Sequence, residues 1–467
     1  MAFLERNANR GSISTGYDVD NSLKLERANS EKLSRTPSSA SNSKTWTYSF
    51  WVKRTQLGIN SYHLEAKGSG DRFFILGFNE NDNLLIYDIY SGDYGKVLTM
   101  KFRDIAAWYH IVLAIDTTDG TAGNRNKFYV NGVLVTDYVT DYGDFPQNYD
   151  TQINKAVVHN IGYRTDINQY ASGYQAETCL IDGAALAPTS FGEFDDNGIW
   201  KPIDVTELTF GTNGFYQEYE SSSALGADTV PGGNSNDYAA SNIAAADQAT
   251  DTPTNNFVTF NPLNPTYASS VISEGATKLK GSGQNTFDNI QTTIGVTKGK
   301  WYCELEPEAD TAAQNTGWGV VNLDTAVFTG DHYSAAGFWS AGFDDGRLAW
   351  HFYNGSGAGT ETVNYGTGSG DTAGTIAMAF DLDNGTLKFY IRNTQLSISA
   401  SSLPAGTYAF YGDVMGTNAP YLRFNFGGYT TNSISSPQSD ANGYGTFEYA
   451  PPTGYYALCT KNLAEFG

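Results

Sequence analysis

Apolar and polar side chains alternate along residues 45–54. Successive side chains of a β-strand point to opposite faces, so a period of two predicts a strand with one face in a core. Trp51 falls on the other face of this pattern. The core-facing residues are predicted to be Trp46, Tyr48, Phe50 and Val52.

A hairpin follows, with apolar runs at 72–78 and 84–90 joined by the polar residues 80–83. Turn residues between two such runs are typical of a β-hairpin. The pattern predicts two paired strands that border the first core.

One hairpin pattern occurs twice in the chain. Aspartate, asparagine and glycine tolerate the backbone conformations of a tight turn, and each copy places them between two apolar runs. Copies separated by so many residues predict two similar domains, because a solenoid would repeat every few tens of residues. Strand, turn and returning strand lie at 108–115, 116–120 and 127–132 in the first copy, and at 375–380, 381–385 and 386–393 in the second.

Composition supports an all-β protein. The 467 residues include 50 Gly and 31 Tyr, and only 17% are charged, which is typical of many strands and turns. The longest helical pattern is the short stretch 242–248, and no apolar run approaches the length that a bilayer requires. We therefore expect no membrane insertion.

Several sequence segments resemble segments of known protein families. Residues 33–37, 51–54 and the closing stretch 176–202 resemble laminin G-like domains of bacteriophage structural proteins. Residues 299–305, 317–320, the second hairpin copy and 422–427 are similar to a SPRY (B30.2-like) module. The stretches 251–263 and 451–463 resemble phage tail and virion proteins. The resemblance implies two concanavalin A-like jelly-roll sandwiches in tandem, which serve as binding scaffolds more often than as enzymes.

The composition changes along the chain predict four parts. Residues 1–20 are polar and without period, and we interpret them as an arm that docks on a neighbouring subunit. A laminin G-like sandwich is expected at 21–205 and a SPRY-like sandwich at 253–467. The small, polar residues between them, 206–252, predict a linker.

The net charge of −22 argues against nucleic acid as a partner, because such a surface repels phosphates. The three cysteines are widely spaced, which predicts neither a disulfide framework nor a zinc site. The first ten residues lack the apolar core of a secretory signal. Adhesion-type modules without an export signal are typical of a particle released by lysis, so the expected location is the surface of a virion.

One acidic stretch offers candidate catalytic residues. Glu304 and Glu306 would share one face of a strand, as in a sandwich-fold glycosidase, but the spacing of Glu304, Glu306 and Glu308 differs from the pattern of that class. The favoured interpretation is a half-solvated strand whose glutamates and Tyr302 face water. His110 and His159 lie in strand patterns and are expected to be packed, so no catalytic residue is predicted.

Calcium remained a minor alternative. Loop carboxylates of jelly-roll lectins bind Ca²⁺, and the hairpin turns supply Asp116, Asp119, Asp381 and Asp383. The competing and favoured role of these side chains is turn capping. We therefore expect no cofactor and no metal.

Binding residues are expected in loops rich in tyrosine and aspartate. Aromatic rings stack on the C–H face of a sugar, while carboxylates and amides fix its hydroxyls. The alternative is that these rings pack within their own domain or on a neighbouring subunit. The candidate residues are Tyr90, Asp93, Tyr94, Tyr138, Asp141 and Tyr142 in the first domain, and His332, Tyr333 and Trp339 in the second.

The sequence thus predicts a non-enzymatic virion protein of a tailed bacteriophage, a fibre, appendage or capsid decoration that binds host or environmental glycans. Other virion proteins would hold it through residues 1–20, and it is expected to form a homo-oligomer. An assembly protein without an outside ligand is the alternative, and a sandwich-fold glycan hydrolase is less favoured.

Overall fold

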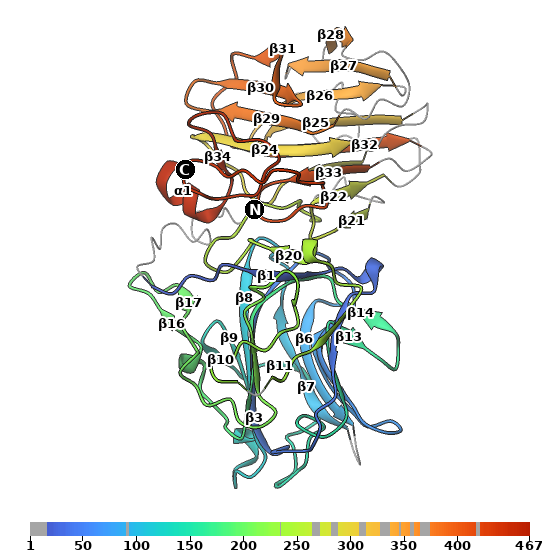
Figure 1. The fold of residues 1–467 in the computed structure, drawn as a ribbon, viewed down its shortest axis with the longest axis vertical. Coiled ribbons are helices and arrows are strands. Elements are labelled where there is room, and N and C mark those ends of the chain that lie inside the picture. The colour runs from blue at the N-terminus through green and yellow to red at the C-terminus, as the bar shows by residue number, and fades with distance from the viewer. Residues whose placement is uncertain are drawn as a thin grey trace. The chain divides into compact units, whose positions relative to one another are not determined.

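The computed structural model describes residues 16–89, 93–233, 235–263, 271–281, 288–307, 314–326, 337–344, 347–354, 359–364, 374–416 and 421–467. The described chain forms two compact units that meet in sequence between Asn255 and Asn256. Figure 1 shows the strands of the first unit in blue to green and those of the second in yellow to red. Each unit contains two large β-sheets, which confirms the prediction of an all-β fold with two sandwiches.

The first sandwich consists of sheets 1 and 2. Sheet 1 has the order β10-β9-β8-β3-β15-β1-β20, with β18 paired to β15, and sheet 2 has the order β11-β7-β6-β5-β4-β12-β2-β19. Sheet 1 contains β1 (Ser22–Leu25), β3 (Thr45–Arg54), β8 (Trp108–Asp116), β9 (Asn126–Val130), β10 (Val133–Val135), β15 (Gly173–Asp182), β18 (Phe215–Gln217) and β20 (Gln248–Ala249). Sheet 2 contains β2 (Lys32–Arg35), β4 (Ser61–Lys67), β5 (Phe73–Phe78), β6 (Asn83–Ile89), β7 (Asp93–Lys101), β11 (Tyr138–Asp141), β12 (Val158–Ile161) and β19 (Ala239–Ser241). Two short hairpins, β13 (Tyr163–Arg164) with β14 (Gln169–Tyr170) and β16 (Gly192–Phe194) with β17 (Trp200–Pro202), stand apart from the sheets.

The first core lies between these sheets. Trp46 on β3 and Phe74 on β5 meet edge to face with ring centroids 5.3 Å apart. The indole N–H of Trp46 donates to the Thr151 hydroxyl at 3.0 Å, so its polar atom is satisfied while the ring is buried. All four core-facing residues predicted for residues 45–54 belong to this cluster. Trp51 points to the other face of sheet 1, as the pattern predicted, and stacks on His110 at 4.7 Å.

The segment 206–252 is part of the first sandwich, which corrects the predicted linker. Its three strands pair within the two sheets: β18 with β15, β19 with β2 and β20 with β1. The physical reason is that the sheets need these short strands to pair their backbone groups. Small, polar composition therefore did not distinguish short closing strands from a flexible connector.

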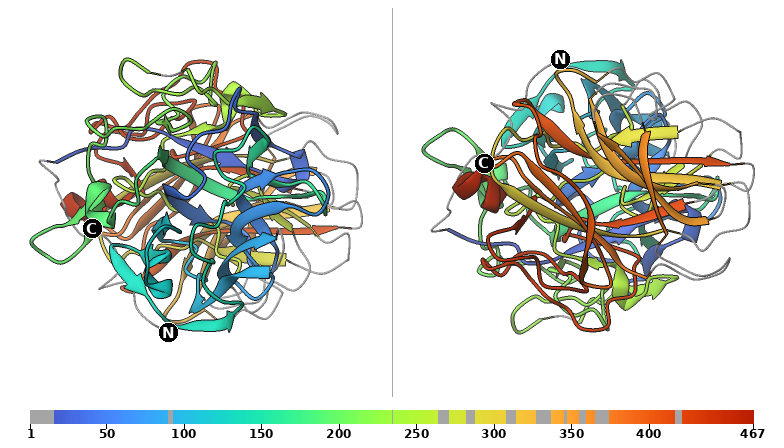
Figure 2. Two further views of the ribbon diagram at one scale, coloured as in Figure 1. Left: turned by 90° about the horizontal axis from the view of Figure 1, so that it is seen from below. Right: turned by 90° about the horizontal axis from the view of Figure 1, so that it is seen from above.

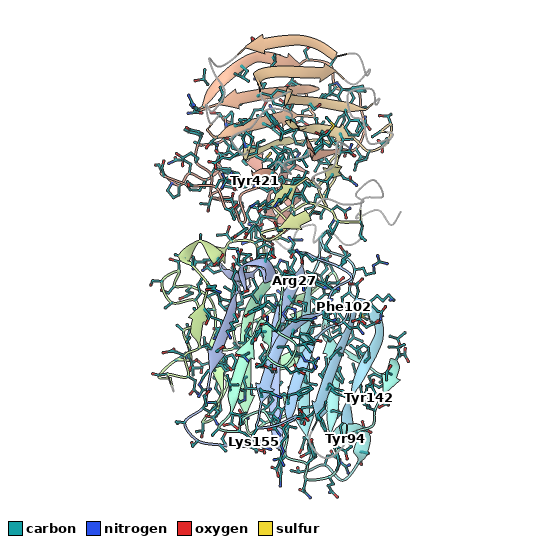
Figure 3. The ribbon with its side chains drawn as sticks, turned by 90° about the vertical axis from the view of Figure 1, so that its right-hand side faces the viewer. Arg27, Tyr94, Phe102, Tyr142, Lys155 and Tyr421 are labelled. Atoms are coloured by element: carbon teal, nitrogen blue, oxygen red, sulfur yellow. The ribbon has the colours of Figure 1, made fainter. Side chains whose placement is uncertain are left out.

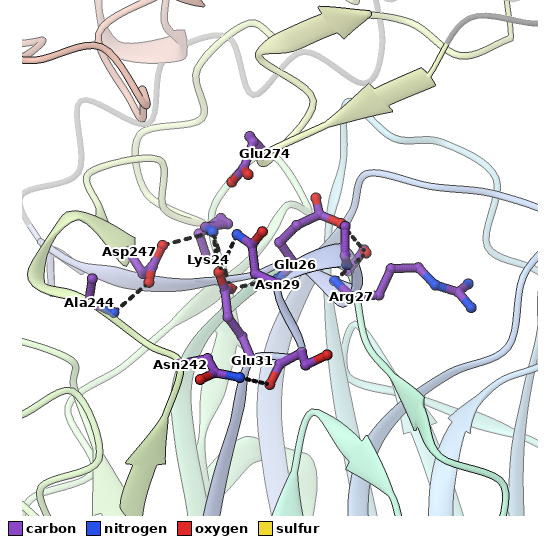
Figure 4. A network of polar contacts seen from close by, with 12 residues as sticks. Lys24, Glu26, Arg27, Asn29, Glu31, Asn242, Ala244, Asp247 and Glu274 are labelled. Atoms are coloured by element: carbon purple, nitrogen blue, oxygen red, sulfur yellow. Dashed lines mark hydrogen bonds and ion pairs between the residues drawn. The ribbon is translucent and has the colours of Figure 1, made fainter.

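Buried ion pairs hold the end of this segment. Lys24 is fully buried and its ammonium contacts Glu31 at 2.9 Å and Asp247 at 2.7 Å, as Figure 4 shows. Lys53 is also fully buried and contacts Asp251 at 2.6 Å. Charges removed from water require partners of opposite sign, so the two lysines fix the segment on sheet 1.

The last residues of the predicted arm also belong to the first sandwich. Val19 is buried, and its backbone N–H donates to the Thr254 hydroxyl at 2.9 Å. The Tyr17 hydroxyl lies 3.1 Å from Glu177 and 2.9 Å from the Tyr216 hydroxyl. The chain is therefore anchored from Tyr17 onward, and residues 1–15 lie outside the described residues.

The second sandwich consists of sheets 3 and 4. Sheet 3 has the order β21-β22-β33-β24-β29-β30-β31, with β34 paired to β24, and sheet 4 has the order β23-β32-β25-β26-β27-β28. Sheet 3 contains β21 (Val271–Ser273), β22 (Lys278–Lys280), β24 (Lys300–Pro307), β29 (Ile376–Asp381), β30 (Thr386–Ile391), β31 (Thr394–Ala400), β33 (Tyr421–Asn425) and β34 (Tyr456–Ala457). Sheet 4 contains β23 (Asp288–Gln291), β25 (Gln314–Asn322), β26 (Phe338–Asp344), β27 (Arg347–Asn354), β28 (Gly359–Asn364) and β32 (Tyr408–Gly416).

The core of the second sandwich includes Trp301 of sheet 3 and Trp318 of sheet 4. Phe380 and Phe410 connect the two sheets edge to face at 4.9 Å. A short helix, α1 (Thr460–Phe466), ends the chain at the margin of this sandwich and is drawn in dark red in Figure 2. The sequence pattern did not predict this helix.

The two hairpin copies are confirmed as antiparallel strand pairs. The first is β8 with β9 and the second is β29 with β30. They occupy neighbouring strands in one large sheet of each sandwich. Among the residues described, no helix is long and apolar enough to cross a membrane.

Candidate binding surface

Strand β6 is apolar on both of its faces. Leu84 and Ile86 point into the first core, whereas Leu85, Tyr87 and Ile89 point to the opposite, outer face of sheet 2 and are only partly buried. A sheet of a sandwich normally exposes polar side chains on its outer face. An outer face that is apolar and aromatic is therefore a candidate for binding.

Neighbouring strands extend this outer face. Leu85 pairs with Val97 on β7, and Tyr87 pairs with Gly95. A Cβ at Gly95 would lie 2.3 Å from the Ile86 carbonyl oxygen, so a side chain would displace β6 at this point. The surface beside Tyr87 stays free of a side chain from position 95.

Tyr142 completes the surface. Its ring meets that of Tyr87 edge to face at 5.3 Å, and 48% of its surface is exposed. Its backbone N–H donates to the Gly95 carbonyl at 2.9 Å, which fixes the residue beside β7. We call Leu85, Tyr87, Ile89, Val97 and Tyr142 the outer-face surface.

The outer-face surface continues into a covered region on β4 and β5. Tyr62, Phe73 and Ile75 are buried there and contact Leu85, Tyr87 and Ile89. The guanidinium of Arg164 lies 5.0 Å from the Tyr62 ring centre and 4.9 Å from that of Phe73. The Arg164 guanidinium thus covers these two rings and stabilises them through cation–π contacts. The exposed part of the outer-face surface is therefore limited to β6, β7 and residue 142.

Tyr94 and Tyr138 face the core side, which corrects their place in an outward platform. Tyr94 packs against Tyr149 at 5.3 Å and Phe145 at 6.3 Å. Tyr138 meets Phe128 at 6.3 Å and donates its hydroxyl to the Val135 carbonyl. Figure 3 labels Tyr94 and Tyr142 at the same end of the first sandwich.

Alternation along the strands explains this division. Tyr138 follows the phase of Leu98, its partner on β7, which is a core residue. Tyr142 follows the phase of Gly95 and Tyr87 and therefore reaches the outer face.

Lys96 on β7 contacts the tyrosine- and aspartate-rich loop that contains Asp141 and Asp144. Its ammonium contacts Asp144 at 2.7 Å and Asp141 at 3.7 Å and lies 4.4 Å from the Tyr138 ring centre. Burial lowers the pKa of Lys96, but the bond to Asp144 and the other nearby anions outweigh burial and raise it. Asp141 remains exposed and also accepts the Gly143 N–H at 2.8 Å. Asp141 pairs with Lys96 and directly precedes Tyr142, so its carboxylate lies on the side of Lys96 and Tyr138, opposite to the outer-face surface.

The remaining candidates fall elsewhere. Tyr90, His332 and Tyr333 lie outside the described residues, and Asp93 is described only as a backbone partner of Ile89. Trp339 is 6% exposed and belongs to the core of the second sandwich, where it meets Tyr408 at 5.6 Å. A glycan platform cannot include a core tryptophan, so this candidate was wrong.

Sequence reasoning missed Tyr87, Leu85 and Ile89. The signal was present, because β6 is apolar at consecutive positions rather than at alternate ones. Such a run indicates a strand buried on both faces, and nothing in the sequence shows which face lacks a cover.

Glu304 is buried, which corrects the prediction that it faces water. Its carboxylate accepts backbone N–H groups from Glu448 and Tyr449, each at 2.8 Å, and the Tyr302 hydroxyl at 3.0 Å. Burial raises its pKa to about 7, although these donors act in the opposite direction. The C-terminal segment covers this face of β24, and its apolar contacts there include Phe447, Tyr455 and Cys459.

The two other glutamates of this stretch differ from Glu304. Glu306 is partly buried and pairs with Arg423 at 3.4 Å. Glu308 lies outside the described residues. Only a structural role is visible for Glu304, which holds the C-terminal segment in place.

Three of the four turn aspartates accept hydrogen bonds from their own turns, and Asp383 accepts one from a distant loop. Asp116 accepts the Thr118 N–H at 3.0 Å, and Asp119 accepts the Thr121 N–H at 2.7 Å. Asp381 accepts the Asn384 N–H at 3.0 Å, and Asp383 accepts the Gly299 N–H. The contacts of Asp116, Asp119 and Asp381 are the capping contacts expected of turns. Within the described ranges no three acidic, histidine or cysteine side chains gather as a metal site would require.

Three histidines of the first sandwich are packed, as predicted for His110 and His159. His110 accepts the Trp200 indole N–H on Nδ1 at 2.9 Å, which leaves its proton on Nε2 facing the Ser49 hydroxyl at 2.8 Å. Burial lowers the pKa of His110 to about 3 and those of His63 and His159 to about 4. All three are neutral at physiological pH.

The sequence of the first sandwich matches one family of known proteins. Residues 28–184 match the family described as the concanavalin A-like lectin/glucanases superfamily. No curated protein matches the chain in sequence. The crystal structure of the TRIM65 PSpry domain is 15% identical, covers 36% of this chain and 91% of that chain, and has a TM-score of 0.27. The SPRY domain of human HERC1 is 14% identical, covers 35% of this chain and 96% of that chain, and has the same TM-score of 0.27. The chain is thus an all-β protein with two large sheets in each of its two units, and its residues 28–184 match the concanavalin A-like superfamily in sequence.

Proposed function

We propose that the protein is a non-enzymatic binding protein that holds glycans on the outer-face surface of its first sandwich. A concanavalin A-like domain fits a carbohydrate- or protein-binding role. The observation that carries the proposal is the pair of the exposed Tyr142 and the partly buried Tyr87 on an otherwise apolar sheet face. Two rings at an angle offer stacking faces for a sugar.

The proposed setting is the surface of a tailed-phage particle, as fibre, appendage or capsid decoration. Its support is the resemblance of several sequence segments to phage structural proteins. These segments are residues 33–37, 51–54, 176–202, 251–263 and 451–463. The burial of Glu304 under the C-terminal segment favours the non-enzymatic role over a glycan hydrolase. A carboxylate that accepts two backbone N–H groups has no open side for a substrate.

The test is binding of the purified protein to a glycan array and to host cells. Replacing both Tyr87 and Tyr142 by alanine should weaken attachment by about 1 to 3 kcal/mol in total, the range typical of lost aromatic contacts. Phe194, an aromatic residue of the first sandwich that is 52% exposed, provides the matched control Phe194→Ala.

Two results would contradict the proposal. Equal binding by the double variant and the parent would exclude the outer-face surface. Absence of glycan binding by the parent, together with failure of the double variant to join particles, would favour the alternative, a purely structural assembly protein.

A further inference from the structure

One flank of the first sandwich is open and apolar. Strand β10 ends sheet 1 and strand β11 ends sheet 2. Only residues 136 and 137 connect them, and the Tyr138 hydroxyl donates to the Val135 carbonyl at 3.1 Å. Both sheet edges therefore lie side by side on one flank.

Exposed apolar side chains concentrate on this flank. Eight large apolar residues are exposed in the described chain, and five of them lie on β7, β10 and β11 or directly after β11. Tyr142 is shared with the outer-face surface. We call the other four the open flank: Met100, Val133, Leu134 and Val139, with exposures of 43%, 58%, 46% and 62%.

The edge of β10 lacks the usual protection. Val130 pairs with Val133 across a turn in which Asn131 and Gly132 have φ angles of 47° and 79°. In such a two-residue hairpin the closing pair is hydrogen bonded, so the next residue, Leu134, directs its backbone N–H and C=O to the sheet edge. Exposed edges are normally blunted by lysine or proline, and β10 contains neither.

We propose that residues 1–13 of a second copy of this chain dock on the open flank. The charges are complementary: residues 131–144 contain three aspartates, of which Asp141 and Asp144 share the contact with Lys96, so acidic groups remain in excess, whereas residues 1–13 contain Arg6, Arg10 and one glutamate. This arm also supplies the apolar residues Phe3, Leu4 and Ile13. It thus carries both the apolar groups and the cations that an acidic, apolar edge would bind.

Geometry favours a second copy over the same chain. The arm leaves the first sandwich at Tyr17, which is bonded to Glu177 on β15. Four strand spacings, about 19 Å, separate β15 from β10. The face of sheet 1 between them is covered by the segment around Trp200, and a Cβ at Gly132 would lie 2.4 Å from that ring. The arm of another copy reaches the flank without crossing this cover, and reciprocal exchange of arms gives a closed dimer.

The first measurement is the mass in solution by light scattering. The full chain should have the mass of two or more copies, and both deletion of residues 1–13 and Leu134→Lys should reduce it to that of one copy. Ile167→Lys, at a residue that is 43% exposed on another part of the first sandwich, should leave the mass unchanged. A full chain with the mass of one copy at micromolar concentration would overturn the proposal. So would a Leu134→Lys variant that keeps the mass of the parent.

Cross-linking identifies the occupant directly. The three native cysteines are buried and form no disulfide, so introduced thiols react selectively. A mixture of Phe3→Cys chains with Leu134→Cys chains, treated with oxidised glutathione, should give disulfide-linked pairs of chains, whereas Phe3→Cys mixed with Ile167→Cys should not. An intrachain link in the double variant without links in the mixture would place the arm on its own chain and refute the proposal. Equal yields of disulfide-linked pairs in both mixtures would show that the links form by random collision, and would also refute the proposal.

The inference is independent of the proposed glycan binding. Leu134→Lys should leave glycan binding per chain unchanged, while Tyr87→Ala with Tyr142→Ala should leave the mass unchanged. The two proposals can therefore fail separately. Failure of the glycan test leaves the dimer proposal standing, and failure of the mass test leaves the glycan proposal standing.

Discussion

Glu304 accepts the backbone N–H of Tyr449 at 2.8 Å. With its second oxygen it accepts the N–H of Glu448, also at 2.8 Å. One carboxylate of sheet 3 thus fixes two consecutive residues of the C-terminal segment over that sheet. The residue with the strongest catalytic pattern in the sequence has a structural role.

Glu304→Gln should therefore destabilise the second sandwich. The amide turns one acceptor oxygen into a donor that faces another donor, and an unsatisfied buried group costs about 1 to 3 kcal/mol. Glu306→Gln is the matched control, because its partly exposed pair with Arg423 should contribute less than about 1 kcal/mol. The measurement is urea unfolding, with a sugar-release assay in parallel. Loss of sugar release at unchanged stability would make Glu304 catalytic.

Acid should destabilise the first sandwich through its buried histidines. In the unfolded chain a histidine binds a proton near pH 6.5, whereas burial lowers the folded pKa of His110 to about 3. The stabilisation is therefore present above pH 6.5 and is lost as the pH falls toward 3. Each such histidine should cost about 2 kcal/mol of unfolding free energy between pH 7 and pH 5.

Comparison of variants isolates this effect. Burial raises the pKa of Glu177 to about 8, and this carboxyl changes stability with pH in the opposite direction. His110→Gln should lower stability at pH 7, because Trp200 and Ser49 lose their partner, but its stability should fall less between pH 7 and pH 5 than that of the parent. Identical pH slopes in urea unfolding would contradict the role given to His110.

A truncation test addresses the segment 206–252. A chain of residues 14–255 should unfold cooperatively, whereas residues 14–205 should not fold. The shorter chain lacks Asp247 and Asp251, so Lys24 and Lys53 would be buried without these anions, and it lacks three strands of the two sheets. Circular dichroism with urea unfolding measures the folded content and the cooperativity of both chains. Equal urea-unfolding midpoints for the two chains would show that residues 206–252 are a linker and not part of the first sandwich.

The buried pair Lys53 and Asp251 should be among the most sensitive positions of the first sandwich. Asp251→Ala leaves a buried ammonium without its partner and should cost about 3 to 5 kcal/mol. It also removes the acceptor of the Trp108 indole N–H at 3.0 Å. Glu193→Ala, which removes the more exposed pair with Lys201, should cost less than about 1 kcal/mol. A cost for Asp251→Ala as small as that of the control, measured by thermal unfolding, would contradict this assignment.

Much of the fold could be predicted because strand periodicity and turn chemistry are local properties. The alternation around Phe50 placed the right residues in the core, and the turns at Asp116 and Asp381 connect paired strands as expected. The short strands β18, β19 and β20 could not be predicted, since two or three residues carry no period.

The candidate surface was predicted only in part. Tyr142 was chosen for its tyrosine-rich surroundings and lies on the outer face of sheet 2, but Tyr94 and Tyr138, chosen for the same reason, point to the core side. Tyr87, its partner on the surface, has only the sequence pattern of an ordinary strand residue. Composition identifies which loops carry rings, while the phase of each neighbouring strand decides which rings reach the surface.

By itself the sequence determined the all-β class, the two sandwiches and the residues that fill the first core, because each depends on patterns within a few neighbouring residues. The tertiary structure alone decided which apolar faces are covered. Sheet 3 has Glu304 and Tyr302 beneath the C-terminal segment, whereas sheet 2 leaves Tyr87 and Tyr142 partly open. The physical reason is that burial depends on segments far apart in the chain, and local alternation contains no information about which segment will pack on a face.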